Sequence, residues 1–479
     1  MDSCDDAVNK KIVIDPIHGD IHLTEQEWKI VDTASFQRLR QIKQLQMAQV
    51  TYPNATHTRF AHSLGTLAMM SRILQLEAIK CEPEEKDNLR MAALLHDVGH
   101  YPYSHLMEHV DQVILTEDFL NSRKPEEKIA IQGTPFPKHG AVGKLIVTHQ
   151  QDLIDAIGDE KRALAVANIF TRATAKDSDY SNLISSSLDM DRLDYLLRDS
   201  RATGVPYGEI DIDYLLNNLK VSPTQEIGIS MKALPAAEQY LFARAFMHRT
   251  VYYHKTTCAI EEACCQLLRR IRDKKHSDYG MPKDGDAVET LVCSEKLGGF
   301  TDAFVDRIID QATQDEDQII QALARCIKSR RPPKLLKGVE VLARKRKSHQ
   351  KTPPPPHIGT LFRQNCKHRL EKICDDYKLE PGQFLLFERN LSLEKQSGLM
   401  GREEFRSESF LEDEKELIKV FRDGDPEPVS MVDIENSLIN ICSSHAYYIH
   451  RLYFLPRTKQ DEIIIGELQS RTEKWDVAD

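Results

Sequence analysis

The stretch Met91–His105 reads MAALLHDVGHYPYSH and places three histidines and an aspartate at the end of an apolar run. His96 and Asp97 stand side by side, directly after the apolar residues. A carboxylate among apolar residues has to be paired or bound to a cation, and imidazole with carboxylate is a common ligand set for divalent ions. A helix C-terminus that stops at Gly99 is the structural alternative. We interpret the stretch as a metal site.

Length and composition describe an ordinary globular chain. It has 479 residues, of which 41% are apolar and 29% charged, enough for two or three domain-sized units. No run approaches the ~18 apolar residues of a membrane helix, and the polar, acidic N-terminus is unlike a signal peptide. The ten cysteines form no C-x-x-C pair, which is typical of reduced thiols. We therefore expect a cytoplasmic protein without a membrane partner.

Two further helical stretches offer ligands of the same kind. His62 stands near the start of an apolar helix that opens at Thr58, and Arg59 lies one turn earlier on the same face. Asp191 stands among apolar residues, and the stripe Asp191, Tyr195 and Asp199 follows helical spacing. A core histidine and a solvated helix face are the structural alternatives. Arginine beside a metal ligand suits an anionic oxygen substrate such as a phosphate.

A third long helix is predicted over Glu238–Leu268. Arg244, His248 and Tyr252 follow one another at i, i+4 spacing and form a stripe on it. Cations interleaved with aromatic rings suit a base and its phosphate chain. A polar packing face explains the same residues equally well.

The remaining chain gives a coarser prediction. Ile12–Leu23 is expected to be extended or a small hairpin, and helical spacing from Trp28 to Leu45 leaves Asp32, Gln37, Arg38 and Arg40 on a solvated face. Near the C-terminus we expect strands at Phe384–Phe387 and Ile463–Ile465. A stiff connector is predicted at Pro353–Pro356, a polar loop at Glu388–Gly401 and a mobile tail after Gln469.

Taken together, His62, His96, Asp97 and Asp191 resemble the metal ligands of the HD metal-dependent phosphohydrolases. The similarity extends to the deoxynucleoside triphosphate triphosphohydrolases, especially the vertebrate enzymes that join a SAM domain to an HD domain. We expect no SAM domain here. The blocks that carry the resemblance stand in the same order as in that family, and they are DPIHG (15–19), FQRLRQIKQL (36–45), TRFAHSLG (58–65), LLHDVGHYPYSH (94–105), DMDRLDYLLRD (189–199) and HRTVYYHK (248–255).

The resemblance implies a mainly α fold. Residues 1–280 would form the HD-domain catalytic core, residues 281–350 a helical extension, and residues 351–479 a smaller α+β lobe with a mobile tail. It also implies one divalent ion, which mixed nitrogen and oxygen ligands allow to be Fe, Mn, Zn or Mg, while Mg accompanies the substrate triphosphate. The ion's ligands would be His62, His96, Asp97 and Asp191.

The family's reaction would release a deoxynucleoside and tripolyphosphate from a dNTP. A divalent ion polarises the α-phosphate, and a histidine with a pKa near ~6.5 passes a proton at cellular pH. The implied catalytic residues are Arg59, His100, His105, Glu108 and His139, with His105 the proton carrier. Glu108 stands where the family has an aspartate. The implied substrate contacts are Gln44, Leu45, Arg59, Arg192, Tyr195, Asp199, Arg244 and Tyr252.

The resemblance also implies an activator site for GTP or dGTP, shared between subunits of a homo-oligomer, a dimer or tetramer. Asp32, Gln37 and Arg40 match its guanine-nucleotide half, and Lys232 and Lys255 remain from the other half. Ile14 and Ser230 replace an Asn and an Arg that the family uses there, so the deoxynucleotide half is altered.

Two alternatives use the same residues differently. Another HD phosphohydrolase would act on nucleoside monophosphates or single-stranded nucleic acid, which Arg192, Tyr195 and Arg244 disfavour. A nucleic-acid-binding protein would keep the metal site for structure and use the basic runs Lys328–Lys334 and Arg344–Lys347. The second run also leaves nuclear localisation open for a eukaryotic protein. The net charge of −10 argues against nucleic-acid binding over the whole surface.

Overall fold

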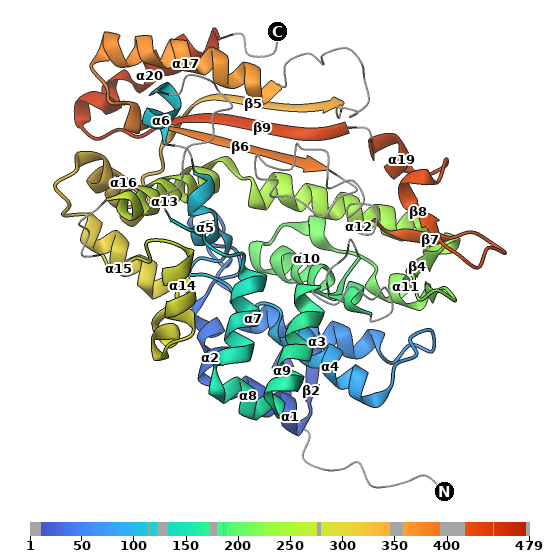
Figure 1. Ribbon diagram of the computed structural model, residues 1–479. Coiled ribbons are helices and arrows are strands. Elements are labelled where there is room, and N and C mark those ends of the chain that lie inside the picture. Colours follow the sequence, from blue (N-terminus) through green and yellow to red (C-terminus); the bar gives the residue numbers. More distant parts are fainter. Residues whose placement is uncertain are drawn as a thin grey trace, which may run out of the picture.

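The structure is a computed structural model that describes residues 11–113, 115–121, 133–172, 180–184, 186, 188–274, 279–344, 358–392, 417–443 and 445–475. Helices dominate it, and a three-stranded sheet lies at the end of the molecule that carries the C-terminus (Figure 1). The predicted mainly α fold with a smaller α+β region near the C-terminus is therefore confirmed.

The first part of the chain begins with an antiparallel hairpin, β1 (Lys11–Asp15) and β2 (Gly19–Leu23), as predicted. The helices that follow are α1 (Glu25–Val31), α2 (Ala34–Gln37), α3 (Arg59–Ile73), α4 (Pro83–Leu95), α5 (His105–Glu108), α6 (Thr116–Asn121), α7 (His139–His149), α8 (Gln151–Ile157), α9 (Glu160–Thr171), α10 (Met190–Thr203), α11 (Ile212–Asn217), α12 (Leu234–Met247) and α13 (Lys255–Asp273).

The second part alternates helices and strands. Its helices are α14 (Gly285–Val292), α15 (Asp302–Ala312), α16 (Gln318–Lys328), α17 (Ile358–Tyr377), α19 (Leu438–Ser443) and α20 (Lys459–Glu473). Its main sheet has the antiparallel order β5 (Lys334–Arg344), β9 (His445–Phe454), β6 (Phe384–Ser392). A second sheet joins β3 (Leu219–Val221) and β4 (Ile227–Ser230) to β7 (Lys419–Phe421) and β8 (Val429–Ser430), so residues from near the C-terminus return to the helical core.

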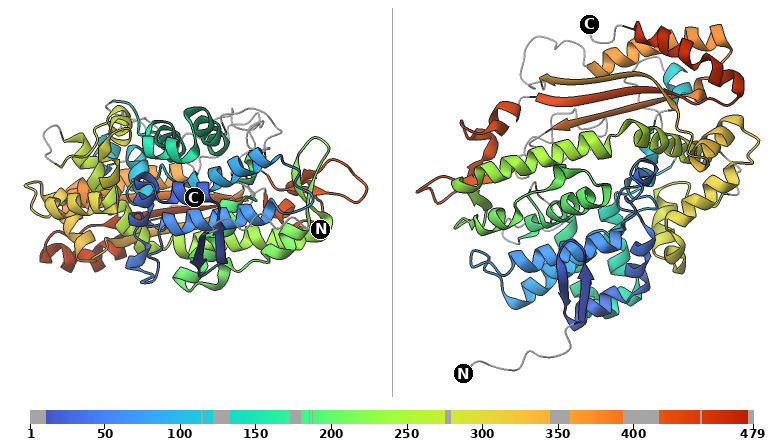
Figure 2. Two further views of the ribbon diagram at one scale, coloured as in Figure 1. Left: turned by 90° about the horizontal axis from the view of Figure 1, so that it is seen from below. Right: turned by 180° about the vertical axis from the view of Figure 1, so that it is seen from behind.

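The sheet β5-β9-β6 is covered on both faces. Helices α17 and α20 lie on one side and α13 on the other, as both Figure 1 and the view from behind in Figure 2 show. Because side chains alternate along a strand, Ile449 and Tyr453 of β9 join the main helical core while Leu452 and Phe454 join a separate apolar cluster under α17 and α20.

The predicted strand at Ile463–Ile465 is wrong, because these residues lie in α20. Thr458 and Asp461 form a capping box that starts the helix, which outweighs the β propensity of three isoleucines. Ile464 and Ile465 pack against the outer cluster, while Ile463 is exposed. The helix runs to Glu473, so the predicted mobile tail does not begin at Gln469. Strand β6 likewise continues to Ser392, past the predicted start of the polar loop at Glu388.

The helix predicted between Trp28 and Leu45 is also wrong, because the chain breaks after Val31. Thr33 accepts a hydrogen bond from the Phe36 backbone N–H and starts the short helix α2. Arg38 is buried rather than solvated. Its guanidinium donates to the carbonyl oxygens of Val98 and His100, at 2.7 and 2.9 Å, and so fixes the loop that follows His96.

The helix predicted over Glu238–Leu268 is broken by a π-helical turn at His248–Tyr252, which separates α12 from α13. Strand β9 holds the backbone after this turn. Arg451 donates to the Tyr253 carbonyl at 2.7 Å, and the Tyr453 hydroxyl donates to the Lys255 carbonyl at 2.9 Å. These two contacts tie strand β9 to the segment that joins the π-helical turn to α13.

Several predictions fall outside the described residues, namely the proline tract Pro353–Pro356, residues 345–347 of the basic run, and residues 393–401 of the polar loop. In the part of the chain that is described, no helix combines the length and apolar character needed to cross a bilayer.

The buried carboxyl of Glu262, in α13, should make the free energy of unfolding depend on pH. Burial raises the pKa of its carboxyl to about 7, and Gln266 donates a hydrogen bond to it at 3.2 Å. An unfolded glutamate loses its proton near pH 4.5, so between these values the folded state binds more protons. Its contribution to the free energy of unfolding is therefore full below about pH 4.5 and falls as pH rises through 7. Glu262→Gln should be more stable than wild type by about 1–3 kcal/mol at pH 8 and similar to it at pH 4.5.

Urea unfolding of both proteins at pH 4.5, 6 and 8 measures this difference. Glu160→Gln, on the exposed start of α9, is the matched control and should follow wild type at every pH. A Glu262→Gln variant whose stability tracks wild type across this range would show that Glu262 ionises normally.

Candidate active site

Three helices bring His62, His96 and Asp191 together. His62 lies in the first turn of α3, His96 caps the C-terminus of α4, and Asp191 lies in the first turn of α10. His62 Nε2 is 2.9 Å and His96 Nε2 is 3.8 Å from Asp191 Oδ1. Their ligand atoms lie within 4.8 Å of one another. The three side chains form a candidate metal site.

The tautomers of these histidines fit a cation at that position. His62 Nδ1 lies 2.7 Å from the Asp194 carboxylate, and His96 Nδ1 lies 2.8 Å from the Ala93 carbonyl. Both partners only accept, so each Nδ1 donates and each Nε2 of the neutral ring keeps a lone pair. The two Nε2 atoms are buried without a hydrogen-bond donor and face carboxylate oxygens. A lone pair against a carboxylate is stable only with a proton or a metal ion between them.

The acids at this site are ionised. Burial by itself would raise the pKa of Asp191, but the adjacent imidazoles of His62 and His96 hold it well below its usual range. Burial would likewise raise the pKa of Asp97. The positive charge of Arg59, which donates a hydrogen bond of 2.7 Å to Oδ2, outweighs burial and holds this pKa well below its usual range. The other oxygen, Oδ1, is 3.1 Å from His100 Nε2 and 3.3 Å from His96 Nε2. Asp97 therefore lies beside the three-residue cluster with both oxygens in use, and its predicted ligand role stays a prediction.

A buried network behind His62 was not anticipated from the sequence. Asp194 accepts from His62, from His18 Nε2 at 2.7 Å and from Arg198 at 2.9 Å. Arg198 also donates to Asp15. The network fixes the ring of His62 and joins the β1–β2 turn to α10. The blocks DPIHG and DMDRLDYLLRD contain these residues, and the i, i+4 pair Asp194–Arg198 is the signal that could have identified them.

Helix α7 packs directly against the loop after Asp97. A Cβ at Gly99 would collide with the backbone of His139 and Gly143, so glycine allows this approach. A second cluster results, in which His100, His105, Glu108 and His139 offer ligand atoms within 4.8 Å of one another. The rings of His100 and His139 stack with centroids 4.3 Å apart.

Glu108 organises this histidine cluster. It lies 2.9 Å from His105 Nδ1 and 3.1 Å from His139 Nδ1, and it accepts the His139 backbone N–H. Burial lowers the pKa of His105, and Glu108 only partly offsets this, so His105 is neutral. Burial would also lower the pKa of His139, but the charge of Glu108 and its hydrogen bond outweigh burial and raise that pKa. Both rings direct Nδ1 to Glu108, which leaves Nε2 for another partner.

Farther along α10, Asp199 is held from two sides. Tyr252 donates to Oδ2 at 2.7 Å, and His57 Nε2 lies 2.8 Å from Oδ1. Tyr195, one turn before Asp199, lies between His62 and Tyr252, with ring centroids 6.4 and 6.5 Å away. The structure therefore brings the predicted stripe next to the metal-type cluster. His57 was not anticipated and has no recognisable pattern around it.

The remaining predicted substrate contacts lie on neighbouring elements. Arg192 is buried and pairs with Asp189, the N-cap of α10. Arg244 is buried in α12, Gln44 is buried after the 3-10 turn Arg38–Gln41, and Leu45 is half-buried. Gln44 Oε1 is buried and has no hydrogen-bond partner among the described residues.

The predicted activator residues are distributed over separate elements. Asp32 caps the C-terminus of α1 and is exposed, and Gln37 accepts from Arg40 Nε at 2.7 Å. The Arg40 guanidinium lies over the Phe60 ring at 3.6 Å. Lys232 and Lys255 are exposed, in the 3-10 turn Met231–Ala233 and at the first residue of α13.

Residues 59–199, which contain both clusters, match the HD domain, and residues 210–311 match the HD associated region. Two known structures share the fold, each with 22% sequence identity. They are a phosphohydrolase from Bacteroides thetaiotaomicron, with a TM-score of 0.66 over 93% of this chain and 100% of that chain, and a hypothetical protein from Aquifex aeolicus, with a TM-score of 0.67 over 96% of this chain and 99% of that chain. The chain therefore contains an HD domain followed by an HD associated region, and it shares its fold with these two structures.

Two curated relatives are similar to the chain over about 280 residues. The chain is 32% identical to the uncharacterized protein YwfO of Bacillus subtilis over 279 residues, which are 56% of this chain and 58% of that protein. It is 28% identical to the human deoxynucleoside triphosphate triphosphohydrolase SAMHD1 over 280 residues, 51% of this chain and 42% of that protein. The matched segments span about half of these relatives, and the chain is similar to them over that part only.

Proposed function

We propose that this chain is a metal-dependent hydrolase that cleaves deoxynucleoside triphosphates at the α-phosphate, releasing deoxynucleoside and tripolyphosphate. The observation that carries the proposal is the stripe on α10. Asp191 belongs to the metal-type cluster, and Asp199 lies eight residues farther on, about 12 Å along the helix axis. Tyr195 lies between them. A sugar seated on Tyr195 would have a phosphate at one end and a hydroxyl at Asp199 at the other.

The metal would be held by His62, His96 and Asp191, with Asp97 as the fourth residue. Bound there, a divalent ion supplies charge that polarises an α-phosphate oxygen. Arg59 supports this site from the protein side, because its guanidinium is anchored on Asp97 and on Ser104 Oγ, at 2.7 and 2.9 Å, and would direct positive charge at the same phosphate. Arg192 and Arg244 would offset the charge of the remaining phosphates.

His105 would carry the proton. It is neutral, and Glu108 fixes the proton on Nδ1, so Nε2 can receive a proton from the attacking water and then deliver it to the leaving ribose oxygen. Because Glu108 also binds His139, the carboxylate holds two imidazoles, and His100 stacks against the second. These contacts would keep His105 in one orientation.

The sugar and base would be recognised at the far end of the site. Asp199 is ordered by Tyr252 and His57 and would accept from the 3′ hydroxyl. Gln44 would contact the sugar or base through its unpartnered Oε1. Leu45 would pack against the same part of the nucleotide. The human and Dictyostelium relatives named as deoxynucleoside triphosphate triphosphohydrolases support this substrate class.

Guanine nucleotide would act as an activator. Asp32, Gln37 and Arg40 would bind its base and phosphates on the exposed surface, and Lys232 and Lys255 would complete the site across subunits of a dimer or tetramer. The cation–π contact of Arg40 with Phe60 holds the guanidinium in place before any ligand binds.

Product analysis tests the proposed function. Purified protein is incubated with each dNTP and Mn or Mg, with and without GTP, and the products are separated by ion-exchange chromatography. We expect tripolyphosphate and deoxynucleoside in equal amounts, with faster release when GTP is present. Release of pyrophosphate or of single phosphates would contradict attack at the α-phosphate.

Two histidine variants sharpen the test. His105→Ala should lower turnover by about 10²–10⁴-fold, the typical contribution of a general acid or base, while keeping the bound metal. His149→Ala, at the exposed end of α7, is the matched control and should behave as wild type. If no dNTP is cleaved with either metal, nucleoside monophosphates and single-stranded DNA are the next substrates to test.

A further inference from the structure

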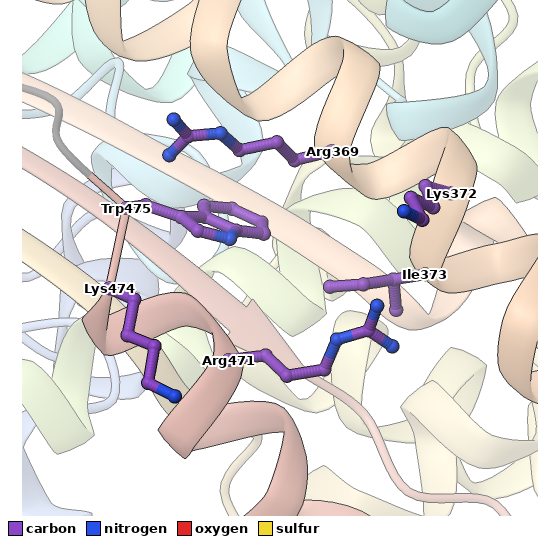
Figure 3. Close-up of a pocket in the computed structure, with 6 residues that line it drawn as sticks. All are labelled: Arg369, Lys372, Ile373, Arg471, Lys474 and Trp475. Carbon is purple, nitrogen blue, oxygen red and sulfur yellow. The ribbon is translucent and has the colours of Figure 1, made fainter.

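A basic pocket lies between α17 and α20, on the face of the β5-β9-β6 sheet opposite α13. Six residues line a cavity of about 320 Å³. Four of them are cations and two are apolar, as Figure 3 shows, and they are Arg369, Lys372, Ile373, Arg471, Lys474 and Trp475. We name these residues the α17–α20 pocket.

The cations of the pocket are only partly neutralised. Arg471 pairs with Asp376 at 2.8 Å. For Arg369, Lys372 and Lys474, the described residues provide no carboxylate within ion-pair distance. Arg369 Nη1 is buried and has no hydrogen-bond partner among the described residues. Among the described residues, three positive charges without an ion-pair partner therefore line one small cavity, in a chain whose net charge is −10.

Packing fixes the positions of the two arginines, whereas Lys372 and Lys474 are exposed at the rim of the pocket. The Arg369 guanidinium lies over the Trp475 ring at 5.6 Å, and the Arg471 guanidinium lies over the Tyr377 ring at 5.3 Å. Trp475 and Ile373 belong to the apolar cluster under the two helices, so the floor of the pocket is part of a buried core. Cations held in place by such contacts lose less side-chain entropy on binding a ligand than solvated ones do.

This arrangement suits a phosphate chain. Arginine forks bind phosphate oxygens in pairs and lysine adds point charge, and four cations match a chain that carries several negative charges. The cavity volume is at the lower end of the ~300–1,000 Å³ that small-molecule sites occupy, which favours a short ligand over an extended one. The unpartnered Nη1 of Arg369 supplies a donor inside the pocket.

We propose that the α17–α20 pocket is a binding site for a short phosphate chain, either inorganic polyphosphate or the phosphates of a nucleotide. The site shares no residue with the HD domain, so the proposal does not rest on the proposed function. It assigns a ligand to the C-terminal helices, which the two matched family models do not cover.

The chain contains its own reporter for the test. It has two tryptophans, Trp28 and Trp475. In a Trp28→Phe variant, Trp475 is therefore the single indole, and its fluorescence reports on the pocket. The full-length variant is titrated with tripolyphosphate, GTP and guanosine, and with sulfate at equal ionic strength. We expect a saturable change with tripolyphosphate and GTP, and none with guanosine or sulfate.

Point variants in the Trp28→Phe background separate this pocket from other phosphate sites. Arg369→Ala and Lys372→Ala should each weaken tripolyphosphate binding at least 10-fold, whereas Lys459→Ala, an exposed lysine at the other end of α20, should leave it unchanged. An Asp191→Ala change should also leave the signal unchanged, which distinguishes this site from the HD domain. A change driven by tripolyphosphate but not GTP would identify free polyphosphate as the ligand. No saturable change, an equal response to sulfate, or insensitivity to Arg369→Ala and Lys372→Ala would overturn the proposal.

Discussion

Asp191→Ala is expected to remove both the bound metal and the dNTP hydrolysis that we propose. The carboxylate is 2.9 Å from His62 Nε2, and two lone pairs face it. Without Asp191 the site keeps two imidazoles but loses an anionic ligand, and binding of a divalent ion weakens. Loss of about 4 kcal/mol of transition-state stabilisation corresponds to about 10³-fold in turnover.

Metal content by inductively coupled plasma mass spectrometry and turnover by product chromatography measure the two effects separately. The control is Asp213→Ala, because Asp213 is an exposed carboxylate that pairs with Arg72 at the surface. That variant should retain metal and activity. An Asp191→Ala protein that keeps wild-type metal content would place the ion elsewhere, and one that keeps activity would refute the assigned site.

Gly65→Ala is expected to be strongly destabilising although it adds one methyl group. A Cβ at this position of α3 would collide with the Asp194 carboxylate and the Arg198 guanidinium, which are both buried. The pair would have to separate, and breaking a buried ion pair costs about 3–5 kcal/mol. Since Asp194 also holds His62 Nδ1, the variant should lose metal affinity by about 10–100-fold in any fraction that folds.

Urea unfolding and metal titration of Gly65→Ala measure these losses. Gly466→Ala is the matched control, because Gly466 is also inside a helix, α20, but a Cβ there meets no atom within 4 Å. That change should stabilise the protein by up to about 1 kcal/mol through helix propensity. A Gly65→Ala variant with similar stability to the Gly466→Ala variant would show that α3 and α10 can move apart at no cost.

The sequence predicts those site residues whose adjacent residues in the chain are apolar. His96 and Asp97 follow an apolar run, and Asp191 stands among apolar residues at the start of a helix, so each is recognisable locally. The contacts that orient them are not local. His18 meets Asp194 across 176 residues, and Arg38 reaches Val98 and His100 across about 60. An isolated arginine on a helical pattern is usually solvated, so nothing near Arg38 distinguishes it.

The secondary-structure prediction is wrong at two helix ends, where one capping side chain or contacts with a distant strand interrupt a helical pattern. The break before Thr33 comes from one hydroxyl that caps the next helix. The backbone directly after the break at His248–Tyr252 accepts hydrogen bonds from Arg451 and Tyr453, which are almost 200 residues away. Periodicity continues through both breaks, because the apolar positions serve the core on either side. A local cap sets the first of these helix ends, contacts with a distant strand hold the backbone beside the second, and periodicity reports neither.

The hydrogen bonds from β9 to Tyr253 and Lys255 make the C-terminal sheet part of the framework around Asp199, because the same turn positions the Tyr252 hydroxyl. The sheet is therefore not an interchangeable module. Replacing it with another domain would leave His62, His96 and Asp191 in place, since α3, α4 and α10 hold them, but would release Tyr252. Divergence in the last ~150 residues of such chains should therefore alter the surroundings of Tyr252 and Asp199 before it alters the cluster of His62, His96 and Asp191.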